Sequence, residues 1–263
     1  MKRKDAKKPL LADSIRKNTA GDVAVYVFDT IDSTNSEAKR MLEAGFRGKA
    51  IIAADTQTGG RGRLGRSFYS PADTGLYFTV IIPPCFDTEH ISMLTPAAAV
   101  AVTRALERAS GKALSIKWVN DIYLGDKKIC GILAESVIDV DAQAFAGFAV
   151  GIGINLSTEY FPEDISGIAA SLGACADRNV LAAQIARELF AMAEKLSERE
   201  FLEEYRAHSY VTGKDIYFIK DGVKTYARAV GIDSLGGLEV RLENGEKTVL
   251  RGGEISVRIA CGK

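Results

Sequence analysis

The chain has 263 residues, of which 47% are hydrophobic and 26% charged, which is typical of a globular protein with one large domain or a large and a small one. Its 34 basic and 34 acidic residues give no net charge, which argues against long-range attraction to nucleic acid. The four cysteines lack CxxC spacing and there are only two histidines, which argues against a zinc site, a disulfide framework and histidine-based catalysis. No segment is apolar enough to span a membrane or to act as a signal peptide, so a cytoplasmic protein is expected.

The N-terminal segment opens with a basic cluster, Met1 to Asp5, and is weakly helical from Leu10 to Lys17. A single short cluster of this kind is more typical of a solvated tail than of a nucleic-acid contact. The segment before the first strand is also too short for a helix-turn-helix domain. We therefore expect no specific binding to DNA.

A predicted strand, Val23 to Phe28, leads into a cluster of small polar residues. Thr34-x-x-Glu37 fits a capping box, which predicts a helix that starts here and stops near Gly45. A cap needs one hydroxyl, whereas Ser33–Asn35 offers three hydrogen-bonding side chains. Such a cluster, beside the exposed N–H groups of a helix start, could hold a polar head group.

A loop rich in glycine and arginine stands between two predicted strands, Ala50–Ala54 and Leu76–Ile82. From Gly59 to Arg66, four glycines and three arginines alternate. Glycine lets the backbone approach a ligand, and arginine brings a permanent charge and a fork of donors that suit carboxylate and phosphate. The loop has neither the P-loop pattern nor a GxGxxG that opens a helix. We interpret it as an anion- or nucleotide-binding loop, with an RNA contact and a plain solvated loop as alternatives.

The longest helical pattern runs from Ile91 to Ser110 and ends at Gly111, with an apolar stripe of small residues that indicates close packing on a sheet. Two strands separated by a kink follow, from Leu114 to Leu124. Gly125-Asp126 then predicts a hairpin turn to a return strand, Lys128–Val137.

Charged residues interrupt these otherwise apolar strands at Lys117, Asp121, Lys128 and Glu135. Such charges can protect the edge of a sheet, or they can point into a cleft. Gly131, inside the return strand, indicates close approach of a ligand or of another backbone.

The segment Phe145–Ile154 is almost continuously apolar, which predicts a strand that is buried on both faces. Gly151 and Gly153 remove side chains where a flat group could lie. Asn155, at the end of the strand, offers a donor and an acceptor that could pair with the edge of an adenine.

Two helices, 179–195 and 198–207, precede a change of pattern near residue 209. Short strands separated by glycine turns then follow at the spacing of a small barrel. These strands are Asp215–Ile219, Thr225–Ile232, Gly237–Leu242, Thr248–Leu250 and Ile255–Ile259. We therefore predict two domains, 1–209 and 210–263.

In chain order, these segments resemble the successive motifs of the biotin protein ligases over nearly the whole chain. The motifs are Asp32-Ser33-Thr34-Asn35, Gln57-Thr58-Gly59-Gly60-Arg61-Gly62-Arg63-Leu64-Gly65-Arg66, Lys117-Trp118-Val119-Asn120-Asp121, Lys128-x-x-Gly131-Ile132-Leu133-x-Glu135, Gly151-Ile152-Gly153-Ile154-Asn155-Leu156 and Gly252-Gly253-Glu254-Ile255-Ser256. Two positions depart from the family pattern. Val119 stands where the family commonly has proline, and Phe68 where some members have tryptophan.

The resemblance implies an α/β fold, with a mixed sheet that has helices packed mainly on one side, as in the class II synthetase-like catalytic domain of biotin ligases. It also implies a small C-terminal SH3-like barrel. The implied activity joins the carboxylate of biotin to the α-phosphate of ATP and then passes biotin to a lysine of a biotin carboxyl carrier protein domain. The chain resembles the ligase-only class, which lacks the winged helix-turn-helix domain of other members. The oligomeric state stays open, a homodimer included.

The resemblance also implies roles for single residues, with Lys128 and Arg63 as the catalytic cations at the transferring phosphoryl group. The residues implied to bind biotin are Ser33, Thr34, Asn35, Gln57, Gly60, Arg61, Gly62, Arg63, Lys128 and Gly131. The residues implied to bind ATP and the adenylate are Arg63, Arg66, Phe68, Asn120, Asp121 and Asn155. Mg²⁺ would bridge the phosphates, and Asp121 is the one candidate ligand, without a firm assignment.

Three other functions stay open. An acyl ligase for lipoate or an octanoyl group could use the same scaffold, but the glycine-arginine loop argues against it. A non-catalytic sensor of biotin or its adenylate is disfavoured by the intact Lys128 and loop arginines. RNA binding through the loop is disfavoured by the zero net charge.

Overall fold

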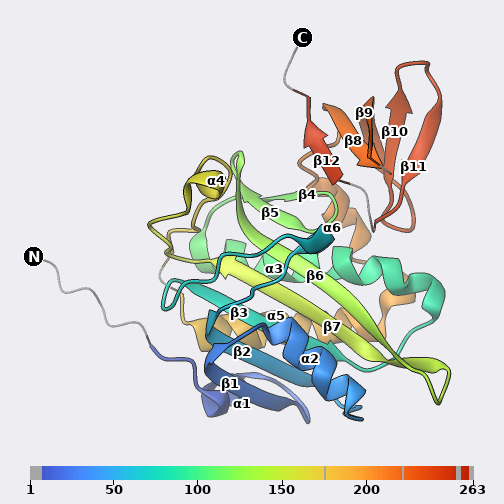
Figure 1. Ribbon diagram of the computed structural model, residues 1–263. Coiled ribbons are helices and arrows are strands. Elements are labelled where there is room, and N and C mark those ends of the chain that lie inside the picture. The colour runs from blue at the N-terminus through green and yellow to red at the C-terminus, as the bar shows by residue number, and fades with distance from the viewer. Residues whose placement is uncertain (1–7, 175, 221, 253–255, 261–263) are drawn as a thin grey trace, which may run out of the picture.

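The computed structural model describes residues 8–174, 176–220, 222–252 and 256–260, and it arranges them around two sheets (Figure 1). The basic cluster Met1–Asp5 lies outside the described residues, as do Gly253, Glu254 and Ile255 of the last motif.

The larger sheet has seven strands among the described residues, in the order β1-β2-β3-β7-β6-β5-β4. Its strands are β1 (Ala24–Ile31), β2 (Ala50–Gln57), β3 (Gly75–Ile82), β4 (Ser115–Lys117), β5 (Asp121–Leu124), β6 (Lys127–Asp139) and β7 (Ala144–Asn155). β1 and β2 are parallel, and the other neighbours in this order are antiparallel. The sheet is therefore mixed, as the sequence predicts.

The parallel pair β1–β2 determines where the polar motifs emerge. Parallel strands need a crossover connection, which α2 (Thr34–Glu43) supplies. Because both strands run in the same direction, their carboxyl ends at Ile31 and Gln57 lie side by side at one edge of the sheet. The polar start of α2 and the glycine-arginine loop leave from this edge, so the topology brings the two motifs together.

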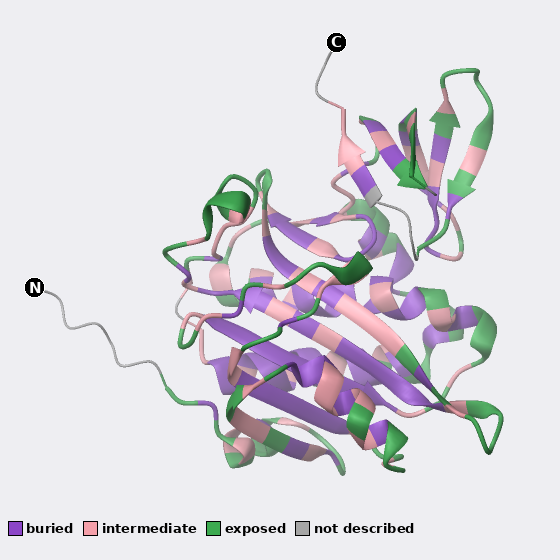
Figure 2. Ribbon diagram, viewed as in Figure 1, coloured by how far each residue is buried: buried purple, intermediate pink, exposed green. Residues whose placement is uncertain are grey.

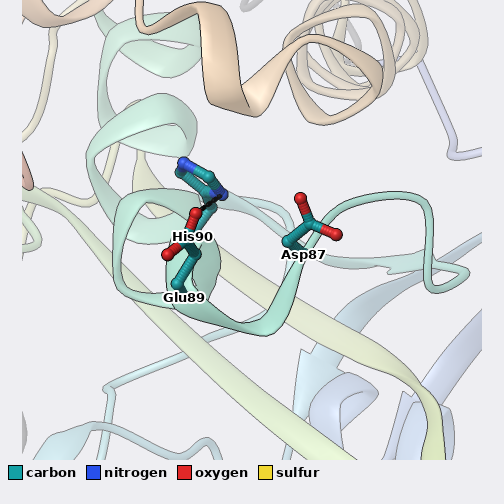
Figure 3. A group of neighbouring side chains, drawn as sticks. All are labelled: Asp87, Glu89 and His90. Atoms are coloured by element: carbon teal, nitrogen blue, oxygen red, sulfur yellow. Dashed lines mark ion pairs between the residues drawn. The ribbon is translucent and has the colours of Figure 1, made fainter.

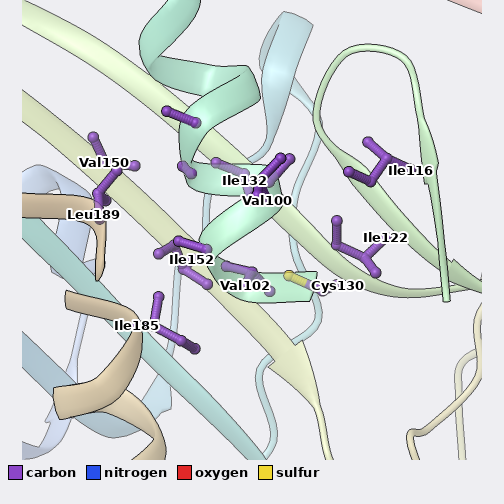
Figure 4. Packing of buried hydrophobic residues seen from close by; sticks show 14 of the residues in the cluster. Val100, Val102, Ile116, Ile122, Cys130, Ile132, Val150, Ile152, Ile185 and Leu189 are labelled. Atoms are coloured by element: carbon purple, nitrogen blue, oxygen red, sulfur yellow. The ribbon is translucent and has the colours of Figure 1, made fainter. Parts of the chain in front are cut away.

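Helices cover the two faces of this sheet unequally. The main face carries α1 (Ala12–Asn18), α3 (Leu94–Ser110), α5 (Arg178–Glu194) and α6 (Leu202–Ala207). Figure 4 shows side chains of α3, α5 and the sheet meeting in this core, with Val100, Ile152 and Ile185 among them. The opposite face carries α2, whose Ala38 and Leu42 are fully buried in a smaller cluster. The prediction of helices mainly on one side is confirmed.

Burial along the strands follows this layered arrangement (Figure 2). β3 is buried at every residue, because helices lie on both of its faces and strands on both of its sides. α3 ends where Gly111 takes a left-handed conformation with φ 67°, a cap that glycine adopts without steric cost.

The smaller sheet is antiparallel, and its five strands among the described residues follow the order β11-β10-β9-β8-β12. They are β8 (Asp215–Lys220), β9 (Val223–Ile232), β10 (Leu238–Leu242), β11 (Lys247–Leu250) and β12 (Ser256–Ile259). The indole nitrogen of Trp118 donates to the carbonyl of Gly236 at 2.9 Å, which ties this sheet to the larger unit. The boundary at residue 209 stays a prediction, because the chain there still pairs with β4 through Ile116.

Three local predictions were wrong. The cap of α2 is Ser33, whose hydroxyl accepts from the N–H of Ser36, and Glu37 pairs with Arg40 instead of closing a capping box. The long helix is preceded by the 3₁₀ segment η2 (Thr88–Met93), so its α-helical part starts later than Ile91. The last predicted helix is replaced in part by the 3₁₀ segment η3 (Leu196–Glu198) and a left-handed residue before α6.

The remaining helical segments are short, namely η1 (Arg63–Gly65) inside the glycine-arginine loop and α4 (Glu163–Ser166). Within the described ranges, no helix is both long enough and apolar enough to cross a membrane.

Candidate active site

A cavity opens between the start of α2, the glycine-arginine loop and strands β6 and β7. We call it the α2 cavity. It is lined by predicted site residues from four segments of the chain: Ser33, Thr34, Asn35, Gln57, Arg61, Gly62, Arg63, Phe68, Asn120, Lys128 and Gly131. Of the residues implied to bind biotin, Gly60 does not line it. A Cβ on Gly60 would lie 2.5 Å from the carbonyl oxygen of Phe68, so this glycine lets the loop fold back on itself.

The polar wall of the α2 cavity is a directional chain of hydrogen bonds. Gln57 Oε1 accepts from the N–H of Thr34 at 2.9 Å and from its hydroxyl at 3.1 Å. The amide nitrogen of Gln57 donates to Ser70 Oγ at 3.0 Å, and Ser70 donates to the carbonyl of Phe68 at 3.0 Å. These groups are uncharged and fixed, so the wall suits a neutral polar ring.

Glycines form the floor of the α2 cavity and leave room for three functional side chains. A Cβ on Gly151 would lie 2.7 Å from Asn35 Oδ1, and one on Gly153 would lie 2.6 Å from the Phe68 ring. At Gly131, a Cβ would lie 2.8 Å from Lys128 Nζ. The sequence predicts a close approach at these glycines. In the structure, the groups that approach them are side chains of the protein itself.

A second cavity adjoins the first, and we call it the β12 cavity because β12 contributes to its wall. All six residues implied to bind ATP line it: Arg63, Arg66, Phe68, Asn120, Asp121 and Asn155. Five of the described residues that line it are cationic, namely Arg63, Arg66, Lys117, Lys128 and Arg258. The two cavities share Gly62, Arg63, Phe68, Asn120 and Lys128, so a group bound in one lies next to a group bound in the other.

The two shared cations are held in place by neighbouring polar groups. Lys128 Nζ lies 2.7 Å from Asp121 Oδ1 and 5.9 Å from the centre of the Phe68 ring. Arg63 donates to Asn120 Oδ1 at 3.1 Å, and Asn120 in turn donates to the carbonyl of Ile132 at 2.8 Å. Burial lowers the pKa of the Arg63 guanidinium, which shows that its charge is poorly solvated before an anion arrives.

Asn155 lines the β12 cavity and carries a buried acceptor. Its side-chain nitrogen donates to the carbonyl of Ala170 at 3.2 Å, whereas its Oδ1 is buried without a hydrogen-bond partner. A buried acceptor of this kind is costly unless a ligand supplies a donor.

Comparison with known proteins agrees with this geometry. Residues 27–155 match the biotin/lipoate A/B protein ligase family, and residues 212–258 match the biotin protein ligase C-terminal domain. The bifunctional ligase/repressor BirA of Escherichia coli is 30% identical over 245 residues, which cover 90% of this chain and 75% of that protein. The chain belongs to the biotin protein ligase family.

Solved structures of biotin protein ligases share the fold. The enzyme from Aquifex aeolicus in complex with biotin and ATP has a TM-score of 0.76 at 28% identity, covering 90% of this chain and 99% of that one. The enzyme from Leishmania major in complex with biotinyl-5-AMP has a TM-score of 0.60 at 25% identity, covering 87% and 99%.

This member of the biotin protein ligase family places two further cations, Lys117 and Arg258, at the β12 cavity. Lys117 donates to the hydroxyl of Tyr123 at 3.3 Å, and burial, with nearby Arg258, lowers its pKa to about 8. In the sequence, Lys117 stands out as a charge inside an apolar strand, which indicates a candidate site residue, but the sequence assigns it no role. Arg258 carried no such signal, because it reaches the cavity through the packing of the smaller sheet.

Among the described residues, two further groups of reactive side chains line neither cavity. Burial raises the pKa of the Cys130 thiol, which makes it a structural residue of the core and not a nucleophile. Asp87, Glu89 and His90 form the one group of metal-ligand type within the described residues (Figure 3). Arg199 lies 3.4 Å from His90 Nε2, and the other ring nitrogen, Nδ1, lies 3.7 Å from Glu89 Oε1.

Proposed function

We propose that the chain activates biotin with ATP to give biotinyl-5′-AMP and pyrophosphate, and then transfers biotin to a lysine of a biotin carboxyl carrier protein domain. The supporting observation is that a cavity with an uncharged hydrogen-bonding wall and a cavity rich in cations meet at Arg63 and Lys128. The α2 cavity suits the uncharged ring system of biotin, and the β12 cavity suits a nucleotide and its phosphates. The carboxylate and the α-phosphate would then meet at the junction.

In the first step, a carboxylate oxygen of biotin bonds to the α-phosphorus of ATP, and the bond to the leaving pyrophosphate breaks. The carboxylate is already ionised at neutral pH, so the step needs no general base. It needs fixed positive charge where the phosphoryl oxygens gain negative charge. Lys128 and Arg63 supply that charge, and Asp121 and Asn120 hold them in position before the substrates bind.

Nucleotide recognition would use further groups of the β12 cavity. Asn155 Oδ1 is the acceptor that an adenine amino group would satisfy, and the Phe68 ring offers an aromatic face nearby. Arg66, Lys117 and Arg258 would hold the phosphates beyond the reacting one.

Mg²⁺ fits this cavity as a companion of the nucleotide. Asp121 is the one carboxylate among the described residues that line the cavity, and its Oδ1 is already paired with Lys128. Mg²⁺ commonly binds through one or two carboxylates and substrate phosphates while it keeps several waters, so a single aspartate is sufficient. Asp121 would hold the ion, which would neutralise phosphate charge.

In the second step, the neutral amine of a carrier lysine attacks the acyl carbon of the adenylate, and AMP leaves. The same cations that stabilise the first step stabilise the departing phosphate. Until the lysine arrives, Arg63 on the loop is the residue that would keep the anhydride from water.

A lipoate or octanoate ligase is the second candidate, because the matched family includes lipoate ligases. Those acyl groups carry no N–H or urea carbonyl, so they would leave the polar wall of the α2 cavity without partners. The test is exchange of labelled pyrophosphate into ATP. We expect exchange that requires biotin and is not supported by lipoate or octanoate; exchange with lipoate alone would overturn the proposal.

A further inference from the structure

Glu135 contacts helix α2 and the glycine-arginine loop, the two segments beside the α2 cavity. It lies on β6, on the same face as Gly131, and its side chain is 21% exposed. Its Oε2 accepts from the Asn35 amide nitrogen at 2.5 Å. Its Oε1 lies 3.0 Å from Lys39 Nζ and 3.5 Å from Arg61 Nη2. Two cations thus balance its charge while its other oxygen engages a residue that lines the cavity.

The bond to Glu135 determines which way the Asn35 amide points. An ionised carboxylate can only accept hydrogen bonds, so the NH₂ group of Asn35 must face it. The Oδ1 of Asn35 then faces the glycine floor, where a Cβ on Gly151 would lie 2.7 Å away. Without Glu135, the two ends of the amide would be free to exchange places.

The neighbouring hydroxyls leave Asn35 Oδ1 available to a ligand. The Thr34 hydroxyl donates its hydrogen to Gln57, so it must accept from Thr79, whose oxygen lies 2.9 Å away. Thr79 Oγ1 lies farther from Asn35 Oδ1, at 3.3 Å. Because a hydroxyl has one hydrogen to give, Asn35 Oδ1 keeps acceptor capacity toward the cavity.

We infer that Glu135 is a positioning residue that fixes the Asn35 amide, so that the α2 cavity presents an acceptor to an N–H group of its ligand. This inference rests on the proposed function, in which the ligand is biotin and its cyclic urea carries two N–H donors. It gives the cavity a basis for choosing a urea over an acyl group without N–H, since the latter leaves the acceptor unsatisfied.

Exchange of the two side chains tests the orientation directly. Asn35→Asp puts a carboxylate against Glu135, and Glu135→Ala removes the acceptor; each should weaken biotin binding about tenfold by titration calorimetry. Glu135→Gln keeps an acceptor and should stay within about threefold of wild type. The double variant Asn35→Asp with Glu135→Gln reverses donor and acceptor, leaves an oxygen facing the cavity, and should also recover to within about threefold. Saturating biotin should restore kcat in the single variants of Glu135.

Lys39→Met is the matched control, because it removes an ion pair of Glu135 but no bond to Asn35, and it should bind biotin like wild type. Melting temperatures identify any variant that fails to fold; if Glu135→Ala does, the exchanged pair decides the question. The inference is overturned if the double variant binds no better than Asn35→Asp, or if a folded Glu135→Ala binds like wild type. Wild type that shows no biotin-dependent pyrophosphate exchange would overturn the proposed function as well, which separates the two failures.

Discussion

The α2 cavity and the β12 cavity share Gly62, Arg63, Phe68, Asn120 and Lys128, but the other groups that line them differ in charge and in origin. The α2 cavity is built largely from neutral side chains that are close in sequence, and Ser33, Thr34 and Asn35 are only 2–3% exposed. Among the described residues, the lining of the β12 cavity includes five cations, which come from the loop, β4, β6 and β12. A fixed neutral network recognises a ring by hydrogen bonds. Neighbouring cations, in contrast, repel one another, and a bound anion relieves that repulsion.

The largest expected effect comes from the junction. Lys128→Ala should lower the rate of adenylate formation by about 100-fold, because a fixed cation at a transferring phosphoryl group is worth about 3 kcal/mol of barrier. Biotin-dependent pyrophosphate exchange measures it. Lys127→Ala is the control, since Lys127 is an exposed neighbour that lines neither cavity. Near-normal activity of Lys128→Ala would mean that this lysine does not act on the transferring phosphoryl group.

The next effect concerns retention of the intermediate. Arg63→Gly removes the charge that links the loop to Asn120 and adds chain freedom, so we expect adenylate to dissociate about 30-fold faster. Released adenylate should label lysines of a bystander such as albumin. The measurement compares wild type and variant at matched adenylate formation, and Arg63→Lys should show a smaller rise. Unchanged dissociation and labelling would show that Arg63 does not retain the adenylate.

A smaller effect should distinguish the two cavities, because only binding in the β12 cavity should depend on pH. With a pKa of about 8, Lys117 is protonated below pH 8 and neutral above it, so its attraction for phosphate is present at pH 7 and lost as the pH rises. The KM for ATP should rise about fivefold between pH 7 and pH 9, and the KM for biotin should not. Lys117→Arg keeps its charge and should flatten the ATP profile. A profile that persists in this variant would assign the titration to another group.

The smallest effect should spare both cavities. Asp32 accepts two hydrogen bonds from Arg40 at 2.8 and 2.9 Å, which lowers its pKa from 3.8 to about 2. Its stabilising contribution is therefore complete above pH 4 and lost as the pH falls toward 2. Because the pair is half exposed, Asp32→Asn should cost only ~0.5–1 kcal/mol of unfolding free energy at pH 7. Denaturant unfolding at pH 7 and pH 3 checks it, with exposed Glu43→Gln as control; a loss of equal size at both values would exclude this ion pair.

The sequence predicts those parts of the two cavities that continuous motifs build. Ser33–Asn35 and Gln57–Arg66 are continuous motifs, and the end of a strand places each of them. The helix stop at Gly111 and the hairpin turn at Gly125 follow from local backbone chemistry, and the structure has both.

What the sequence does not predict depends on tertiary packing. Arg258 joins the β12 cavity only because the smaller sheet packs beside Trp118. The cap of α2 falls on Ser33 and not Thr34, because the Thr34 hydroxyl is used by Gln57, which lies on another strand. The role of Glu135 likewise depends on contacts with α2 and the loop, both distant from it in sequence.

Because β1 and β2 are parallel, the connection that leads into β2 lies far from both site motifs. Foreign sequence could be inserted in that connection. The connection 44–49, from α2 to β2, lies at the sheet edge opposite the one from which both site motifs emerge. Arg47 and Gly48 are exposed there, and exposed loop tips accept inserted domains more readily than buried backbone does. A fluorescent reporter or an affinity tag inserted between these two residues would therefore lengthen the crossover without covering either cavity.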